Sequence, residues 1–214
     1  MTTATMDIEI IKSDVKKLTE KARTASAALS LIDEKTKNAA LEKMAAALRA
    51  AKKEIVEKNK SDVEAAKKAG RTKALVDRLT LNDERVDGMA EGLLDMAKLE
   101  DPIGEVLREW TRPNGMKIQQ VRVPLGVVGM IYESRPNVTA ESAGLCLKSG
   151  NAVILRGGSE AFNSNKVLVD ILTTALKDAQ IPDHAVQLLP PQDRRSITVM
   201  TQSVGDVDST PRGE

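Results

Sequence analysis

The sequence predicts an α/β protein in which N-terminal helices precede a β-hairpin and part of a doubly wound parallel sheet. Three observations predict this class. An apolar periodicity typical of helices runs through the N-terminal part, an Asn-Gly pair separates two β-prone runs, and apolar runs alternate with amphipathic stretches from Leu125 onward. Because the pattern changes at Pro102, we divide the chain into a helical segment at 1–101, a hairpin at 102–124 and an α/β segment at 125–214.

Apolar residues recur at steps of three and four in the first segment, which predicts helices there. Between 38 and 56 this spacing predicts an amphipathic helix. Ser61 and Glu64 have the spacing of a capping box, and Gly70 suits the left-handed position that follows a helix. We therefore expect a separate short helix at about 61–69.

The chain changes from helix to strand around Pro102. A further apolar stripe at 86–97 predicts a helix that ends before this proline. The runs 106–110 and 117–123 then flank Arg-Pro-Asn-Gly at 112–115, which predicts an antiparallel hairpin. An isolated two-stranded ribbon is only marginally stable, so we expect this hairpin to contact another subunit, in a homo-oligomer, or another domain.

From Leu125 the sequence alternates strands with helices. Such alternation implies right-handed crossovers and a parallel, Rossmann-like sheet, whose ligands bind beyond the carboxyl ends of the strands. The last helix of the series would be capped by Asp193. The expected elements follow in the order strand 125–132, helix 139–149, strand 152–155, helix 159–179, strand 186–189 and helix 193–202.

The loop after the second strand is the first candidate site. Gly157 and Gly158 would let the backbone approach a ligand, with the amides at the start of the next helix facing the pyrophosphate of a reduced pyridine nucleotide. Arg156 could bind a phosphate such as the 2′-phosphate of NADP, and Ser159 or Glu160 could hold a ribose hydroxyl. The run matches neither G-x-G-x-x-G nor the P-loop pattern, so a tight strand-to-helix turn with a solvated arginine stays open as the alternative.

The loop after the first strand is the second candidate site. It reads Glu133-Ser-Arg-Pro-Asn137, in which Pro136 fixes a non-helical exit from the strand. Asn137 could offer its amide N–H to a developing oxyanion, or it could cap the next helix.

Composition narrows the functional classes. The 214 residues carry 32 basic and 31 acidic side chains, with one Trp, one Tyr and one Phe, so neither a general positive field nor a base-stacking surface predicts nucleic-acid binding. One cysteine and one histidine argue against a metal cluster or a disulfide framework. Without a membrane-length apolar run or a signal-peptide pattern, we expect a cytoplasmic protein that does not contact membranes.

The chain resembles the γ-glutamyl phosphate reductases of the aldehyde dehydrogenase superfamily. The resemblance is carried by Pro-Leu-Gly-Val-Val-Gly-Met-Ile-Tyr-Glu-Ser-Arg-Pro-Asn-Val-Thr at 124–139 and by Leu-Lys-Ser-Gly-Asn-Ala-Val-Ile-Leu-Arg-Gly-Gly-Ser-Glu-Ala at 147–161. It implies a truncated aldehyde dehydrogenase-like fold and NADPH-dependent reduction of L-glutamyl 5-phosphate, an acyl phosphate, to glutamate 5-semialdehyde in proline biosynthesis. It also places the NADP(H) site at residues 156–160 and at Glu133, Ser134, Arg135 and Pro136, with the oxyanion role carried over to Asn137.

The residues that carry the resemblance do not include the family's nucleophilic cysteine. Members of the family attack the acyl phosphate with a cysteine thiolate in a second domain, whereas the one thiol here, Cys146, lies on a predicted buried helix. We therefore expect an N-terminal fragment with a partial cofactor site that is inactive alone. The alternatives are a non-catalytic nucleotide-binding module that pairs with a subunit through residues 106–123, and a helical interaction protein driven by residues 1–100.

Overall fold

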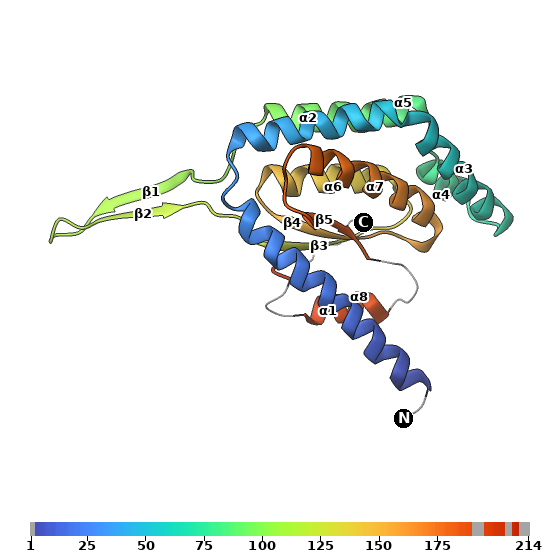
Figure 1. Ribbon diagram of the computed structural model, residues 1–214, viewed down its shortest axis with the longest axis horizontal. Helices are drawn as coiled ribbons and strands as arrows, with labels where there is room; N and C mark the ends of the chain where they lie inside the picture. Colours follow the sequence, from blue (N-terminus) through green and yellow to red (C-terminus); the bar gives the residue numbers. More distant parts are fainter. Residues whose placement is uncertain (1–2, 190–194, 204–206, 210–214) are drawn as a thin grey trace.

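The computed structural model describes residues 3–189, 195–203 and 207–209, in which helices surround a short parallel sheet (Figure 1). The N-terminal part is helical, as predicted. Its helices are α1 (Thr3–Leu29), α2 (Glu34–Ala50), α3 (Lys52–Lys68), α4 (Lys73–Leu79) and α5 (Asp83–Lys98).

Parallel strands form the centre of the molecule in the order β3-β4-β5, which confirms the predicted parallel sheet. The register pairs Ile131 with Arg156, so the carboxyl ends of β3 and β4 lie side by side. The helix after β5 is present, but its predicted cap, Asp193, lies outside the described residues. The elements are β3 (Val127–Ile131), α6 (Asn137–Lys148), β4 (Ala152–Arg156), the 3₁₀ turn η1 (Ser159–Ala161), α7 (Phe162–Asp178), β5 (Val186–Leu188) and α8 (Arg195–Gln202).

Helices cover both faces of the sheet. Helices α6 and α7 pack on one face, and α1 and α8 pack on the other (Figure 1). Helices α2 and α5 form a further layer outside α6 and α7. Because a strand between two helical layers has no solvated face, every residue of β4 is buried.

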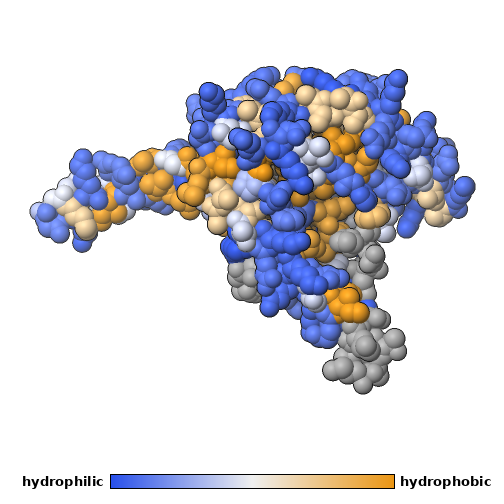
Figure 2. All heavy atoms as spheres, viewed as in Figure 1, coloured by the Kyte–Doolittle hydropathy of each residue, from blue (hydrophilic) through white to orange (hydrophobic). Residues whose placement is uncertain are grey.

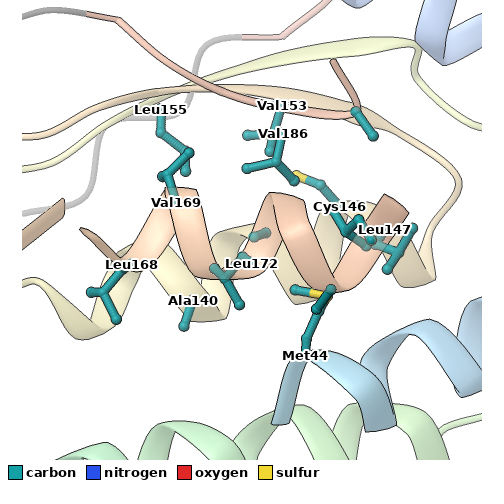
Figure 3. Packing of buried hydrophobic residues seen from close by; sticks show 14 of the residues in the cluster. Met44, Ala140, Cys146, Leu147, Val153, Leu155, Leu168, Val169, Leu172 and Val186 are labelled. Atoms are coloured by element: carbon teal, nitrogen blue, oxygen red, sulfur yellow. The ribbon is translucent and has the colours of Figure 1, made fainter. Parts of the chain in front are cut away.

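One aliphatic core joins these layers. Between the sheet and α6 and α7, Val153 and Val186 face Cys146 and Leu172, and Met44 of α2 packs from the next layer (Figure 3). The same cluster extends from α1 to α8, so the N-terminal helices and the α/β segment share one hydrophobic interior.

Two buried lysines connect the helical layers at one end. The Lys148 ammonium donates to Asn38 Oδ1 at 2.7 Å and forms an ion pair with Glu34 at 3.1 Å. Lys37, almost fully buried, forms an ion pair with Asp101. Pairing of this kind is what allows a charged side chain to be buried.

The predicted hairpin is confirmed and projects from the body (Figure 1). It consists of β1 (Val106–Thr111) and β2 (Lys117–Val121), joined by a turn in which Gly115 has a φ of 84° and the Asn114 side chain accepts the Met116 amide. Nearly all of its residues are exposed.

The boundaries predicted within the first segment are wrong in two places. The expected helix at 38–56 ends at Ala50, because the chain turns at Ala51 before α3 begins. The expected capping box is absent: Ser61 lies inside α3, and its hydroxyl donates to the Lys58 carbonyl at 2.8 Å. The real side-chain caps belong to Asp33, Thr72 and Asn82, which accept amides of α2, α4 and α5.

Within the part of the chain that the structure describes, no helix combines the length and apolar character needed to span a bilayer.

Candidate functional site

The two candidate loops meet beyond the carboxyl ends of β3 and β4. The Tyr132 amide donates to the Arg156 carbonyl at 3.1 Å, and the Ser134 hydroxyl donates to the Glu160 carboxylate. The structure thus brings the first half of the 133–137 loop against the 156–160 loop. The end of β5 runs into residues 190–194, outside the described residues.

Glu160 is the half-buried acceptor at this junction. Partial burial acts to raise the pKa of its carboxyl, but hydrogen bonds from Ser134, its own amide and Ser159, with the charge of Arg71, outweigh burial and lower it. Glu160 is therefore ionised near neutral pH, and Ser159 beside it is exposed. An anchored carboxylate beside an exposed hydroxyl can accept hydrogen bonds from a ligand's hydroxyl groups.

Side chains of the chain itself occupy the space beside the two glycines of this loop. A Cβ at Gly157 would collide with the amide of Asn165, and a Cβ at Gly158 would collide with the carboxylate of Glu160. Both glycines are buried. The expectation that they open the backbone to a ligand is therefore not met: the atoms that approach them belong to neighbouring side chains.

Arg156 is neither solvated nor presented at the surface. Its side chain is 6% exposed, and its guanidinium donates to the Gly157 carbonyl at 2.7 Å. In this arrangement it cannot reach a cofactor phosphate, so both readings made for it from the sequence need correction. The cause is its position as the last residue of β4, which is covered on both faces.

The Ser164 amide, in the first turn of α7, is also not free for a pyrophosphate. Asp62 of α3, 4% exposed, accepts the Ser164 amide at 2.8 Å, the Ser164 hydroxyl at 2.6 Å and the Asn163 side-chain amide at 2.7 Å. A carboxylate of the chain thus occupies the positive end of this helix. The prediction of a pyrophosphate concerned the amides where the 155–160 loop meets its helix, and for those amides it stays a prediction.

Sequence reasoning missed Asp62 and its neighbour Asn59. The Asn59 amide donates to the Leu79 carbonyl and to Ser164, and its oxygen accepts the Leu81 amide. The available signal was their place on α3: both lie on the same helical stripe as the buried Ile55. Polar residues on an apolar stripe indicate buried partners.

Asn137 begins α6 rather than capping it. Pro136 takes the capping position without a side-chain bond, and the Asn137 side chain donates to Glu141 at 2.9 Å. Its predicted role as a cap is therefore wrong.

A buried polar chain supports both loops from below. Tyr132 shares a 2.7 Å hydrogen bond with Thr139, and the Thr139 hydroxyl lies 3.0 Å from the Asn165 side-chain oxygen. Burial raises the pKa of Tyr132 to about 12, against the opposing effect of the Thr139 bond. Tyr132 thus stays protonated and positions the loops.

Two neighbouring cavities open beside these loops. One, of about 380 Å³, lies between the α4–α5 connection and the start of α6, and the other, of about 360 Å³, lies between α4 and the 132–138 loop. Arg78 and Arg135 line both. A larger hollow, of about 670 Å³, lies between α2, α3 and α7, and its lining combines alanines with the charged side chains of Lys43, Glu54, Asp170 and Asp178.

The thiol of Cys146 is remote from this chemistry. Burial raises its pKa to about 12, so it carries no thiolate at neutral pH. Within the described residues, no group of three or more His, Cys, Asp or Glu side chains could hold a metal ion.

Comparison with known proteins identifies the class. Residues 5–207 match the model of the aldehyde dehydrogenase family, and the chain belongs to this family. Within it, the chain is similar to proteins named γ-glutamyl phosphate reductase, which confirms the resemblance predicted from the sequence. That of Halothermothrix orenii is 52% identical and that of Clostridium acetobutylicum 48% identical, each over 204 residues and 95% of this chain.

Solved structures of the same family have a similar fold. The γ-glutamyl phosphate reductase of Thermotoga maritima superposes with a TM-score of 0.91 at 42% identity, covering 94% of this chain and 48% of that one. The Saccharomyces cerevisiae protein gives 0.85 at 32% identity, covering 94% and 51%. A probable aldehyde dehydrogenase from Listeria monocytogenes, 16% identical with a TM-score of 0.74, shares the fold.

The chain spans about half the length of the curated relatives it matches: the H. orenii and C. acetobutylicum alignments each cover 49% of the relative.

Proposed function

We propose that this chain is the N-terminal, cofactor-binding part of a γ-glutamyl phosphate reductase, acting in the cytoplasm in proline biosynthesis. The reaction of the whole protein would be the NADPH-dependent reduction of L-glutamyl 5-phosphate to glutamate 5-semialdehyde and phosphate. The observation that carries the proposal is the identity of 52% over 95% of the chain.

The cofactor would lie against the junction of the 133–137 and 156–160 loops. The ionised Glu160, held by Ser134, suits a ribose hydroxyl as hydrogen-bond donor, and the exposed Ser159 adds a second polar contact. The buried Arg156 does not fit the 2′-phosphate, so a preference for NADP(H) over NAD(H) would have to come from other residues. When bound, the nicotinamide supplies the hydride.

The chain alone would not complete the reaction. A thioester step needs a thiolate, and the one thiol of the sequence is buried with a pKa of about 12. Asn137, at the mouth of the 380 Å³ cavity, stays a candidate oxyanion donor for a nucleophile supplied by another polypeptide segment.

The test is a pair of measurements on the purified chain. Fluorescence titration with NADPH should show saturable binding, weakened about tenfold by Glu160→Ala, because a hydrogen bond to a charged group is lost. Glu64→Ala, at an exposed position of α3, is the control and should bind normally. Absence of NADPH binding would refute the cofactor role, and NADP-linked oxidation of glutamate 5-semialdehyde by the chain alone would refute the need for a second thiol.

A second proposed role is subunit interaction through residues 106–123. The supporting observation is the hairpin, which stands away from the body and exposes Val106, Leu107, Trp110 and Val121 (Figure 2). Unpaired strand edges with apolar side chains favour pairing with another chain. The partner could be a second copy, in a homo-oligomer, or a longer subunit of the same family.

A further inference from the structure

We propose that Arg78 and Arg135 form an anion-binding cleft that holds a phosphate or carboxylate group of a small ligand. This inference deepens the proposed function, on which it rests for the identity of that ligand as an acyl phosphate with an amino-acid end. The cleft itself is defined by side chains that the comparisons do not assign.

The two arginines converge from different elements. Arg78 lies near the end of α4, and Arg135 lies in the loop between β3 and α6. Both line each of the two neighbouring cavities described above, so their guanidinium groups border one shared space. Two planar donor groups at one cavity are suited to a planar or tetrahedral oxyanion.

Neither arginine is engaged by the protein. Within the described residues, the side chains of Arg78 and Arg135 form no hydrogen bond or ion pair, and both are exposed. The third arginine of the cavities behaves differently: Arg85 donates to the Thr80 carbonyl at 2.8 Å and to the Asp77 carboxylate at 3.0 Å. Arg85 thus holds the α4–α5 connection in place, while the other two remain available.

The carboxylates at the cavities differ in whether an arginine neutralises them. Asp77 is paired with Arg85, and Glu141 accepts the hydrogen bond of Asn137. Glu133 is the one lining carboxylate without such a partner in the described part of the chain. The Arg78 and Arg135 side chains are therefore opposed by the charges of Glu133 and Glu141, so the cleft would hold an anion through two free guanidinium groups and not through a net positive charge.

The location fits the reacting end of a substrate. Asn137, the candidate oxyanion donor, lines the first cavity of the cleft, and Ser134, which donates to Glu160, lines the second. An anionic group bound there would place the carbon attached to it beside the proposed cofactor loop. Arg78 and Arg135 are thus assigned to binding the substrate's charge.

The cleft can be tested without turnover. Arginine Nε–Hε signals of the ¹⁵N-labelled chain are followed by NMR during titration with inorganic phosphate, and separately with L-glutamate, at constant ionic strength. Saturable shifts are expected at Arg78 and Arg135, with half-saturation at about 1–10 mM for a small exposed ion. A response to phosphate identifies a phosphoryl subsite, a response to glutamate alone identifies a carboxylate subsite, and no saturable response to either overturns the proposal.

Matched variants distinguish anion binding at the cleft from nonspecific attraction to positive charge on the protein. The double variant Arg78→Gln/Arg135→Gln should lose saturable binding, whereas Arg108→Gln/Arg112→Gln, which removes two exposed arginines of the hairpin, should bind normally. Glu133→Gln should tighten binding severalfold, because it removes the opposing charge. Equal losses in both double variants, or weaker binding in Glu133→Gln, would overturn the cleft. The NADPH titration of the unmodified chain is a separate measurement, so either proposal can fail while the other stands.

Discussion

The buried carboxylate of Asp62 determines which group accepts hydrogen bonds from the first turn of α7. The strand, glycine pair and helix around residue 157 are typical of a phosphate-binding turn, and that pattern predicted a pyrophosphate at the start of α7. The structure instead supplies the negative charge from α3, through Asp62. The sequence could predict the turn because it is local, but Asp62 and Ser164 are 102 residues apart.

Replacing Asp62 with alanine should lower the free energy of unfolding by about 2–4 kcal/mol, because the Ser164 and Asn163 donors lose a charged acceptor in a buried place. Urea denaturation followed by circular dichroism measures the change. Ser61→Ala, one residue away, should change stability by less than about 0.5 kcal/mol, since Ser61 is not a cap. A large loss in Ser61→Ala together with a small one in Asp62→Ala would contradict the observed α3.

Glu160 gives a prediction about pH. Its pKa lies below the ordinary value of 4.5, so its interactions stabilise the fold above that pH and are lost as the pH falls through the lowered pKa. Ser134→Ala removes a hydrogen bond to the ionised form and should raise the Glu160 pKa. A carboxyl ¹³C NMR titration measures this shift, with Ser149→Ala, which lies in another loop, as the control. An unchanged Glu160 pKa would refute the contact between the two loops.

Elements differ in how far the sequence determines them. The hairpin was predictable because Asn114 and Gly115 fix its turn chemistry. The strands β3 and β4 were predictable because they are apolar runs, apart from Arg156 at the end of β4. The break between α2 and α3 at Ala51 was not predictable from the sequence, because alanine favours helices. The break depends on how α2 and α3 pack against α7. The roles of Gly157 and Arg156 also depend on tertiary neighbours.

At the element scale, Trp110→Glu should weaken self-association of the chain without unfolding it. Trp110 lies on β1 and is 42% exposed, so its replacement costs the body no core contact but places a charge on the proposed contact surface. Light scattering after size-exclusion chromatography measures the mass across a concentration series. Thr111→Glu, at an exposed position of β1 opposite Lys117, changes the charge by the same amount and is the control for the hairpin. If the wild-type chain stays monomeric at every concentration, the homo-oligomer proposal fails.

In the residues that the structure describes, one large apolar cluster joins the helical segment to the sheet, and a second, smaller cluster consists of Val63, Ala66, Leu79 and Ala161. Helices α2 and α5 pack on α6 and α7, and one apolar cluster includes residues of the helical segment and of the sheet (Figure 3). Segments that share a core lose their packing together. The boundary at Pro102 is therefore a change of secondary structure and not a boundary between two separately packed domains.

The chain should accordingly unfold in a single transition. In a Trp110→Phe variant, Tyr132 of the sheet region is the one remaining Tyr or Trp, so its fluorescence reports the α/β segment. Far-ultraviolet circular dichroism mainly reports the helices, and the two urea transitions should coincide. Transitions with separate midpoints would show that residues 1–101 and 125–214 fold independently.

The position of α1 has a consequence for synthesis. Helix α1 is synthesised before the sheet on which it packs: the Gln187 side chain donates to the Leu18 carbonyl across 169 residues of sequence. At about 5–20 residues per second, translation needs roughly 8–34 s to produce the second partner after the first. Until β3, β4 and β5 are made, the apolar stripe of α1 lacks the sheet on which it packs, so we expect the nascent chain to expose this stripe to chaperones.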